Sequence, residues 1–319
     1  MDLDRRSLIT AALAAAPALA SAQPDPAEVI PLWPAGPPGG GGQGLREEMV
    51  ERAKPGQPAD RAVTAVVRPK LTVFRPERPN GHACLIAPGG GYVRVVVDKE
   101  GFEFARFLAA RGVTAYVLLY RLPSDGWAGG RDAPLQDVQR AIRLVRAATP
   151  ATSSVSALGF SAGGHLTAQL ITRFTERTYA PVDGADRLSA RPDVAGLIYP
   201  VISMRPETAH AGSRRQLLGE TPSAADTAAY SMDTRVTAAA PPTFLVHAAD
   251  DASVPIENSL GMYAALRRAR VATEAHWFEE GGHGFGRRGA AGKPAAATPE
   301  LFHAWWMRQV ARTQAQGEP

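Results

Sequence analysis

This 319-residue chain contains a single cysteine, Cys84, so an intramolecular disulfide is impossible. The absence of disulfides is compatible with folding in a reducing cytoplasm. Cys84 lies in the apolar run of residues 82–87, which predicts a buried strand. A buried cysteine among apolar residues is typically a packing residue, and we do not expect it to be a nucleophile.

Other missing features exclude several classes of function. There is no H-E-x-x-H motif and no cluster of cysteine and histidine, which argues against a metal centre, and no cofactor is expected. The net charge is +4, but lysine and arginine are scattered, so no nucleic-acid-binding module is predicted. Beyond the N-terminal apolar stretch, no segment is long and apolar enough to span a bilayer.

The N-terminus has the pattern of a bacterial export signal. Paired arginines at positions 5–6 precede an apolar stretch at 8–20, which ends in small residues. The arginine pair resembles a twin-arginine signal, while the ordinary secretory route and an N-terminal helix of the domain remain alternatives. We therefore expect residues 1–22 to be a signal peptide cleaved before Gln23, and the mature protein to be periplasmic or secreted.

Residues 23–62 are rich in proline and glycine and contain too few apolar side chains to pack alone. They are predicted to form an exposed arm, with Leu32-Trp33-Pro34 as its anchor on the rest of the chain. From residue 63 the pattern becomes regular, and residues 63–319 are predicted to form a single catalytic domain with an α/β fold.

Within residues 63–319, short apolar runs alternate with segments of helical spacing. Such alternation predicts a mostly parallel central sheet with helices on both faces. Reactive groups in such sheets gather at the carboxyl ends of the strands. The strands are expected at 71–74, 83–87, 113–119, 155–158, 195–199, 243–248 and 273–278, and the helices at 101–111, 133–148, 165–171, 258–268 and 299–310.

The most informative motif is the serine-centred segment at 159–163, Gly-Phe-Ser-Ala-Gly, between an expected strand and an expected helix. A serine flanked by glycines at a strand-to-helix turn is the nucleophile elbow of α/β-hydrolases. The motif alone also fits a serine in a glycine-rich turn, but the strand, the helix and the downstream partners favour the elbow. We therefore predict an α/β-hydrolase fold with Ser161 as its nucleophile.

A serine hydroxyl needs a base to take its proton and a carboxylate to orient that base. In this fold the acid follows the serine and the histidine comes last. His283 alone combines a late position, glycine neighbours and a preceding strand, so it is the predicted base. Both Asp250 and Asp251 satisfy the order, but many such hydrolases place the acid three residues before a Val-Pro pair, which favours Asp251. The other six histidines are predicted to be structural or on the surface: His82, His165, His210, His247, His276 and His303.

The reaction intermediate carries a negative oxygen that backbone N–H groups must stabilise. One expected donor is Ala162, which follows the nucleophile. The other comes from a loop after an early strand, where lipases and esterases carry an H-G-G-G motif. Here a Pro-Gly-Gly-Gly-Tyr segment takes that place, so Gly90 and Gly91 are the expected donors. We assign Tyr92 to substrate binding, with packing in the core as the alternative.

Several segments together resemble a known family. APGGGY, DAPLQDVQRAIRLVR, GFSAGGH, SRRQLLG and GGHGFG are similar to α/β-hydrolase esterases of the acetylxylan esterase-like and feruloyl esterase-like (BD-FAE) type. The resemblance extends from about residue 31 to residue 306. It implies a triad of Ser161, Asp251 and His283, an acyl-enzyme mechanism, and a role beside xylan-degrading enzymes.

The resemblance implies deacetylation of sugars or of plant cell-wall polysaccharide such as xylan. The stretch at 200–242 is short for a large lipase lid, which favours a small-molecule or oligosaccharide ester. A peptidase of the prolyl-oligopeptidase type is the first alternative, although the chain has no room for a propeller domain. A non-enzymatic ligand-binding protein on the same scaffold is the second, although all three triad residues are present. The oligomeric state is not predicted.

Overall fold

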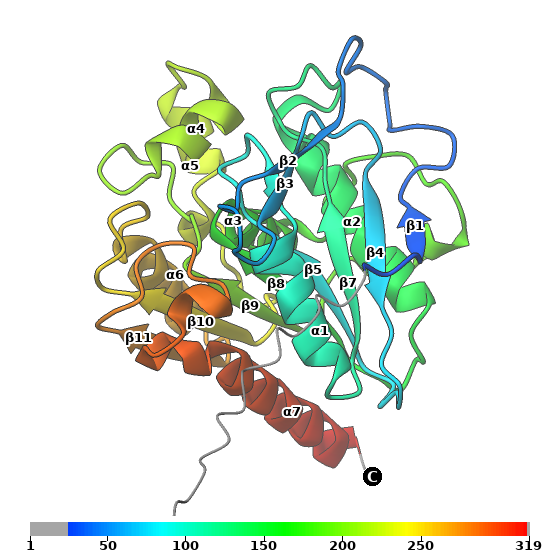
Figure 1. Cartoon of the computed structure of the whole chain (residues 1–319), viewed down its shortest axis with the longest axis vertical. Helices are drawn as coiled ribbons and strands as arrows, with labels where there is room; N and C mark the ends of the chain where they lie inside the picture. Colours follow the sequence, from blue (N-terminus) through cyan, green and yellow to red (C-terminus); the bar gives the residue numbers. More distant parts are fainter. Residues whose placement is uncertain (1–24, 318–319) are drawn as a thin grey trace, which may run out of the picture.

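The computed structural model describes residues 25–317, so the predicted signal peptide, residues 1–22, lies outside the described residues (Figure 1). The main sheet runs in the order β1–β4–β7–β5–β8–β9–β10–β11. Strands β7, β5, β8, β9, β10 and β11 are parallel to one another, and β4 is antiparallel to both of its neighbours. The strands span β1 Val29–Pro31, β4 Lys70–Phe74, β7 Thr114–Leu119, β5 Ala83–Ala87, β8 Val155–Phe160, β9 Val194–Ile198, β10 Thr243–Ala248 and β11 Thr273–Phe278.

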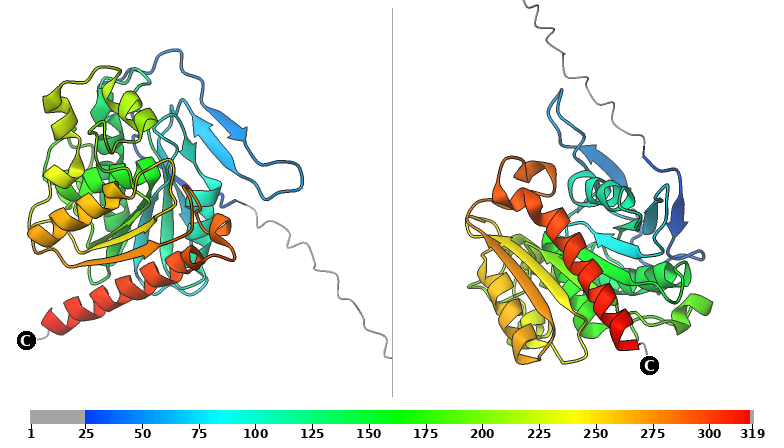
Figure 2. Two further views of the ribbon diagram at one scale, coloured as in Figure 1. Left: turned by 90° about the vertical axis from the view of Figure 1, so that its left-hand side faces the viewer. Right: turned by 90° about the horizontal axis from the view of Figure 1, so that it is seen from below.

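Helices cover both faces of this sheet (Figures 1 and 2). Helices α1 and α7 pack on one face, and α2, α3 and α6 pack on the other. The arrangement confirms the predicted α/β-hydrolase fold with a mostly parallel sheet. The helices span α1 Glu103–Ala109, which follows a short π-helical segment at Asp98–Phe102, α2 Ala133–Ala147, α3 Ser161–Arg173, α6 Glu257–Arg268 and α7 Thr298–Gly317.

The central strands are almost entirely buried because helices lie on both faces. Every residue of β5, β8, β9 and β10 is buried, which explains why their sequences are almost entirely apolar. Cys84 is among them, and burial raises the pKa of its thiol to about 12. The cysteine is therefore a packing residue, as predicted.

The described part of the predicted arm, residues 25–62, contributes more to the fold than an exposed arm would. Strand β1 is the edge strand of the main sheet, paired with β4. Strands β2 (Glu48–Glu51), β3 (Arg61–Thr64) and β6 (Val95–Val96) form a second, antiparallel sheet, so the expected boundary at residue 63 falls inside β3. Trp33 is buried as predicted for the anchor, and its indole N–H donates to Asp137 Oδ1 at 2.7 Å.

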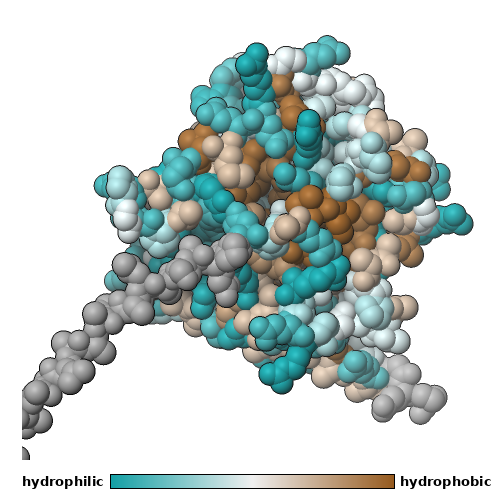
Figure 3. All heavy atoms as spheres, turned by 45° about the vertical axis from the view of Figure 1, so that its right-hand side comes forward, coloured by the Kyte–Doolittle hydropathy of each residue, from teal (hydrophilic) through white to brown (hydrophobic). Residues whose placement is uncertain are grey.

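On the β1 side of the molecule, hydrophobic side chains gather in the middle of the face, with hydrophilic ones around them (Figure 3). A cavity of about 310 Å³ beneath β1 has Val29, Met49 and Phe102 among its lining residues. Between β9 and β10 the chain forms two short helices, α4 (Ala211–Leu218) and α5 (Ala224–Ala229), and no strand is assigned there in the described chain. This excursion lies beside the carboxyl ends of the strands, where the predicted reactive residues also lie.

Candidate active site

Ser161 stands at the junction of β8 and α3, with a backbone φ of +51°. Residues with a side chain seldom adopt this left-handed conformation outside strained functional turns. The neighbouring Gly163 is needed for close packing, because a Cβ there would lie 2.1 Å from the carbonyl oxygen of Ala87. The glycine thus lets α3 approach β5, and the turn has the geometry of the predicted nucleophile elbow.

Three side chains form a continuous chain of hydrogen bonds at this turn. Ser161 Oγ lies 2.8 Å from His283 Nε2, and His283 Nδ1 lies 2.7 Å from Asp251 Oδ2. Since a carboxylate only accepts, the Nδ1–H of His283 donates to it, which leaves Nε2 free to accept the serine proton. The structure therefore brings together the three residues that the sequence singled out, each after the carboxyl end of its own strand.

Asp251 and Asp250 have different tasks. Asp251 is buried, and its Oδ1 accepts the backbone N–H groups of Ser253 and Val254, both at 2.9 Å. Burial alone would raise the pKa of Asp251, but hydrogen bonds from two histidines outweigh it and hold that pKa well below its usual value. Asp250 is exposed, and its Oδ1 accepts the N–H groups of Gly281 and Gly282 at 2.9 and 2.7 Å. Asp251 orients the base, and Asp250 supports the loop that carries it.

His247 was predicted to be a structural histidine, and the structure shows that it contacts the acid directly. Its Nε2 lies 3.2 Å from Asp251 Oδ2 and 2.9 Å from the carbonyl oxygen of Val254. Both neighbours are acceptors, so Nε2 carries the proton and donates to them. Nδ1 lies 2.7 Å from the hydroxyl of Ser259. A histidine within the otherwise apolar strand β10, four residues before the acid, was the available signal for this contact.

A cavity of about 310 Å³ opens at Ser161. The two glycines predicted to stabilise the oxyanion, Gly90 and Gly91, are part of its wall. Their φ angles are +134° and +66°, and a Cβ on Gly90 would lie 2.2 Å from the carbonyl oxygen of Arg94. Ala162 is buried in the first turn of α3, where amide N–H groups have no partner within the helix. Two of the expected donors thus share the cavity wall with Ser161 and the third is its neighbour in the chain, and their role in stabilising an oxyanion stays a prediction.

Tyr92 does not line this cavity, so its assignment to substrate binding is wrong. It is fully buried, and its hydroxyl lies 2.8 Å from His165 Nδ1. The His165 Nε2–H donates to the carbonyl oxygen of Tyr230 at 2.9 Å, so Nδ1 accepts from the tyrosine. Burial lowers the pKa of His165 to about 4, which keeps the ring neutral. The backbone at Tyr92 has a φ of +62°, and the side chain packs in the core beneath the glycine loop.

We expect Tyr92→Phe to lower the free energy of unfolding by about 1–3 kcal/mol, because it removes the hydroxyl that His165 Nδ1 accepts from in the core. Urea unfolding followed by tryptophan fluorescence measures the change. Tyr116→Phe is the matched control, since no partner for the Tyr116 hydroxyl is found among residues 25–317, and it should change stability by less than about 0.5 kcal/mol. A raised KM with unchanged stability in Tyr92→Phe would restore the substrate-binding role.

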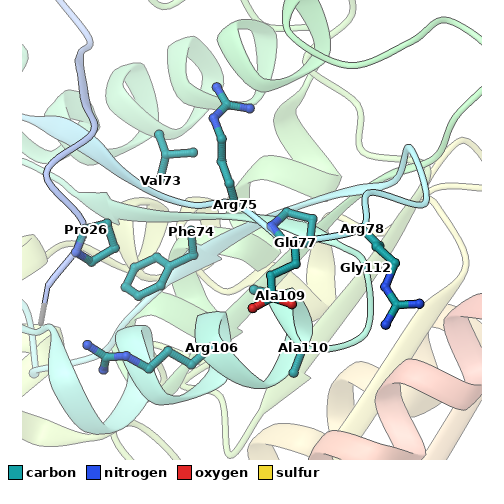
Figure 4. A pocket seen from close by; sticks show the side chains of 11 residues that line it. Pro26, Val73, Phe74, Arg75, Glu77, Arg78, Arg106, Ala109, Ala110 and Gly112 are labelled. Atoms are coloured by element: carbon teal, nitrogen blue, oxygen red, sulfur yellow. The ribbon is translucent and has the colours of Figure 1, made fainter. Parts of the chain in front are cut away.

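A further cavity lies away from Ser161. A cavity of about 660 Å³ lies between β4 and α1, with Phe74 and Arg106 in its wall (Figure 4). It is at the end of the sheet where the parallel strands begin and shares no lining residue with the Ser161 cavity.

Within residues 25–317, no cluster of histidine, cysteine and acidic side chains of metal-site size is found, and no helix has the length and hydropathy to cross a bilayer.

Comparisons with known proteins agree with this geometry. The model of the BD-FAE family matches residues 82–266. The acetylxylan esterase of Xylanibacter ruminicola is 32% identical over 225 residues, which cover 68% of this chain and 44% of that protein. Endo-1,4-beta-xylanase B of Butyrivibrio fibrisolvens is also 32% identical over 225 residues, covering 69% of this chain and 34% of its own length. The chain thus spans less than half the length of these two curated relatives.

Among solved structures, an acetyl ester-xyloside bifunctional hydrolase from Caldicellulosiruptor lactoaceticus superimposes with a TM-score of 0.68 at 33% identity. The match covers 90% of this chain and 98% of that protein. The similarity therefore includes nearly the whole of that solved chain, and not only the motif around the serine.

Proposed function

This chain belongs to the BD-FAE family, and on that premise we propose that it is a serine carboxylic ester hydrolase that removes acetyl groups from sugars or from xylan-type polysaccharide. The observation that carries the proposal is the hydrogen-bonded chain of Ser161, His283 and Asp251 beside an open cavity. Two proteins similar to this chain support acetylated sugars or xylan as the substrate class, because they are named as an acetylxylan esterase and an acetyl ester-xyloside hydrolase.

The proposed mechanism follows from the geometry. His283 Nε2 takes the proton of Ser161 as the serine oxygen attacks the ester carbonyl, and Asp251 stabilises the resulting imidazolium. The backbone N–H groups of the Gly90–Gly91 loop and of Ala162 stabilise the oxyanion. His283 then gives its proton to the leaving alcohol, and an acyl-enzyme remains. Water, activated by the same histidine, releases the acid and restores the serine.

The size of the cavity favours a small acyl group. A volume of about 310 Å³, shared between the acyl and alcohol parts of the ester, is near the lower end of the range for ligand sites. The proposal is therefore an acetyl esterase, and the signal-like residues 1–22 lead us to propose that it acts outside the cytoplasm.

The test compares three substrates at equal enzyme concentration: acetylated xylo-oligosaccharide, feruloylated arabinoxylo-oligosaccharide, and a proline-containing peptide amide. Acetate release should exceed ferulate release by about tenfold or more in kcat/KM, and cleavage of the amide should be undetectable. Faster ferulate release would reassign the acyl group, and cleavage of the amide alone would favour the peptidase.

A further inference from the structure

The wall of the Ser161 cavity carries an excess of positive charge. Arg52, Arg94 and Lys99 line it, and Glu100 is the one carboxylate among its described lining residues. The Glu100 carboxylate is occupied, because it accepts the N–H of Gly89 at 2.8 Å and the hydroxyl of Tyr199 at 3.1 Å. Both donors are neutral, so Glu100 keeps its negative charge and offsets part of the positive charge, and the wall as a whole retains an excess of positive charge.

Two of the three cations lack an ion-pair partner. Arg52 pairs with Asp60 at 2.5 Å. Within residues 25–317, neither Arg94 nor Lys99 lies at ion-pair distance from a carboxylate. Arg94 is exposed and Lys99 is half-buried, so both charges can reach a ligand in the cavity. An excess of charge of one sign in a cleft attracts a ligand of the opposite sign.

Both cations lie close to backbone that borders the predicted reaction site. The Arg94 side chain passes over Gly90, since its Cγ lies 2.9 Å from the point where a Cβ on Gly90 would be. Lys99 lies beside the histidine loop, with its Nζ 3.9 Å from the corresponding point on Gly284, and Glu100 Oε1 lies 3.6 Å from the same point. His283 must deliver its proton to the leaving oxygen, so the alcohol part of the ester lies on the Lys99 side.

His210 adds an uncharged donor to the same wall. Its Nδ1 accepts the backbone N–H of Ser213 at 3.1 Å, which places the ring proton on Nε2. No acceptor for this Nε2–H is found in the described part of the chain, and its Cε1 lies 3.8 Å from the point where a Cβ on Gly91 would be. The cavity therefore offers two cations without an ion-pair partner and one neutral donor to the ligand.

We propose that the ester bound here carries a carboxylate in its alcohol part, as an acetylated xylo-oligosaccharide with a uronic acid branch does, and that Lys99 and Arg94 bind this carboxylate. The proposal rests on the proposed esterase function and narrows its substrate class. It predicts a preference for acidic over neutral acetylated oligosaccharides, and a preference that salt weakens because the binding charges are partly exposed.

The experiment uses two substrates that differ in charge alone: acetylated xylo-oligosaccharide with a uronic acid branch, and the same branch with its carboxyl reduced to the alcohol. The readout is the ratio of kcat/KM, acidic over neutral, from acetate release. Wild type should give about fivefold to tenfold at low ionic strength, and less at high ionic strength. In Lys99→Met and Arg94→Gln the ratio should fall toward one. Arg268→Gln, an exposed cation on α6 outside the cavity wall, should keep the wild-type ratio.

The outcomes separate the two proposals. A wild-type ratio of one, with normal acetate release from the neutral substrate, overturns this inference and leaves the esterase proposal intact. A ratio that stays high in both variants also overturns it. A preference seen only with aryl hemisuccinates, which carry the carboxylate in the acyl part, places the charge on the wrong side and overturns it. No acetate release from either oligosaccharide overturns both proposals.

Discussion

Replacing Ser161 by alanine should lower kcat for hydrolysis of an aryl acetate by about 10⁴-fold or more, while the protein remains folded. The loss is large because the hydroxyl is the atom that forms the acyl-enzyme, and the described cavity wall holds no second group hydrogen-bonded to His283 Nε2 that could replace it. Alanine has the same Cβ as serine, so the strained backbone at φ +51° should not destabilise the variant more than it destabilises wild type. Initial rates of p-nitrophenol release measure the effect, and thermal unfolding confirms the fold.

Ser153→Ala is the matched control, because Ser153 lies in the loop before β8 and Ser161 follows the opposite end of that strand. It should retain wild-type turnover. Labelling with a fluorophosphonate gives an independent readout, since the probe reacts with an activated serine: wild type and Ser153→Ala should be labelled and Ser161→Ala should not. Wild-type turnover in Ser161→Ala would remove the serine from the mechanism, and unlabelled folded wild type would favour a binding protein.

The central part of the fold was predictable because its chemistry is local. Strands β5, β10 and β11 have the bounds expected from the sequence. For β5 and β10 the reason is that a strand between two helical layers must be apolar at nearly every position, whereas β11 is an edge strand that is only partly buried. Strand β2 was not predicted: all four of its residues are exposed, so its sequence shows no alternation. Strand β1 is three residues long, and its partner β4 lies about forty residues further along the chain. Only the tertiary structure brings such partners together.

The candidate site, like the fold, was predictable only in part. The triad was predictable because its chain order and flanking glycines are properties of the sequence itself. The contacts of Tyr92, His210 and His247 were not, because each depends on the direction in which one side chain points. Tyr92 follows a glycine loop at the cavity yet turns into the core, while His210 belongs to an excursion far along the chain and becomes part of the cavity wall. The order of motifs along the chain does not encode these directions.

Replacing Asp251 by asparagine should lower kcat by about 10⁴-fold, an effect close to that of losing the serine. Every contact of this carboxylate is with a donor: Ser253 and Val254 N–H groups at Oδ1, and His283 and His247 at Oδ2. Asparagine turns one oxygen into an NH₂ group, which opposes donors in either orientation. When the NH₂ group faces His283, no acceptor remains for Nδ1–H. The ring proton then moves to Nε2, and Nε2 cannot take the proton of Ser161.

Asp250→Asn is the matched comparison and decides between the two neighbouring aspartates. Asp250 uses only its Oδ1, which accepts from Gly281 and Gly282, and asparagine keeps an equivalent oxygen. Its kcat should therefore stay within about threefold of wild type, because the loop that positions His283 keeps both hydrogen bonds. Both variants are assayed with an aryl acetate and checked by thermal unfolding. A large loss in Asp250→Asn with little change in Asp251→Asn would exchange the two roles, and equal losses in folded protein would mean that the loop geometry matters as much as the charge behind the base.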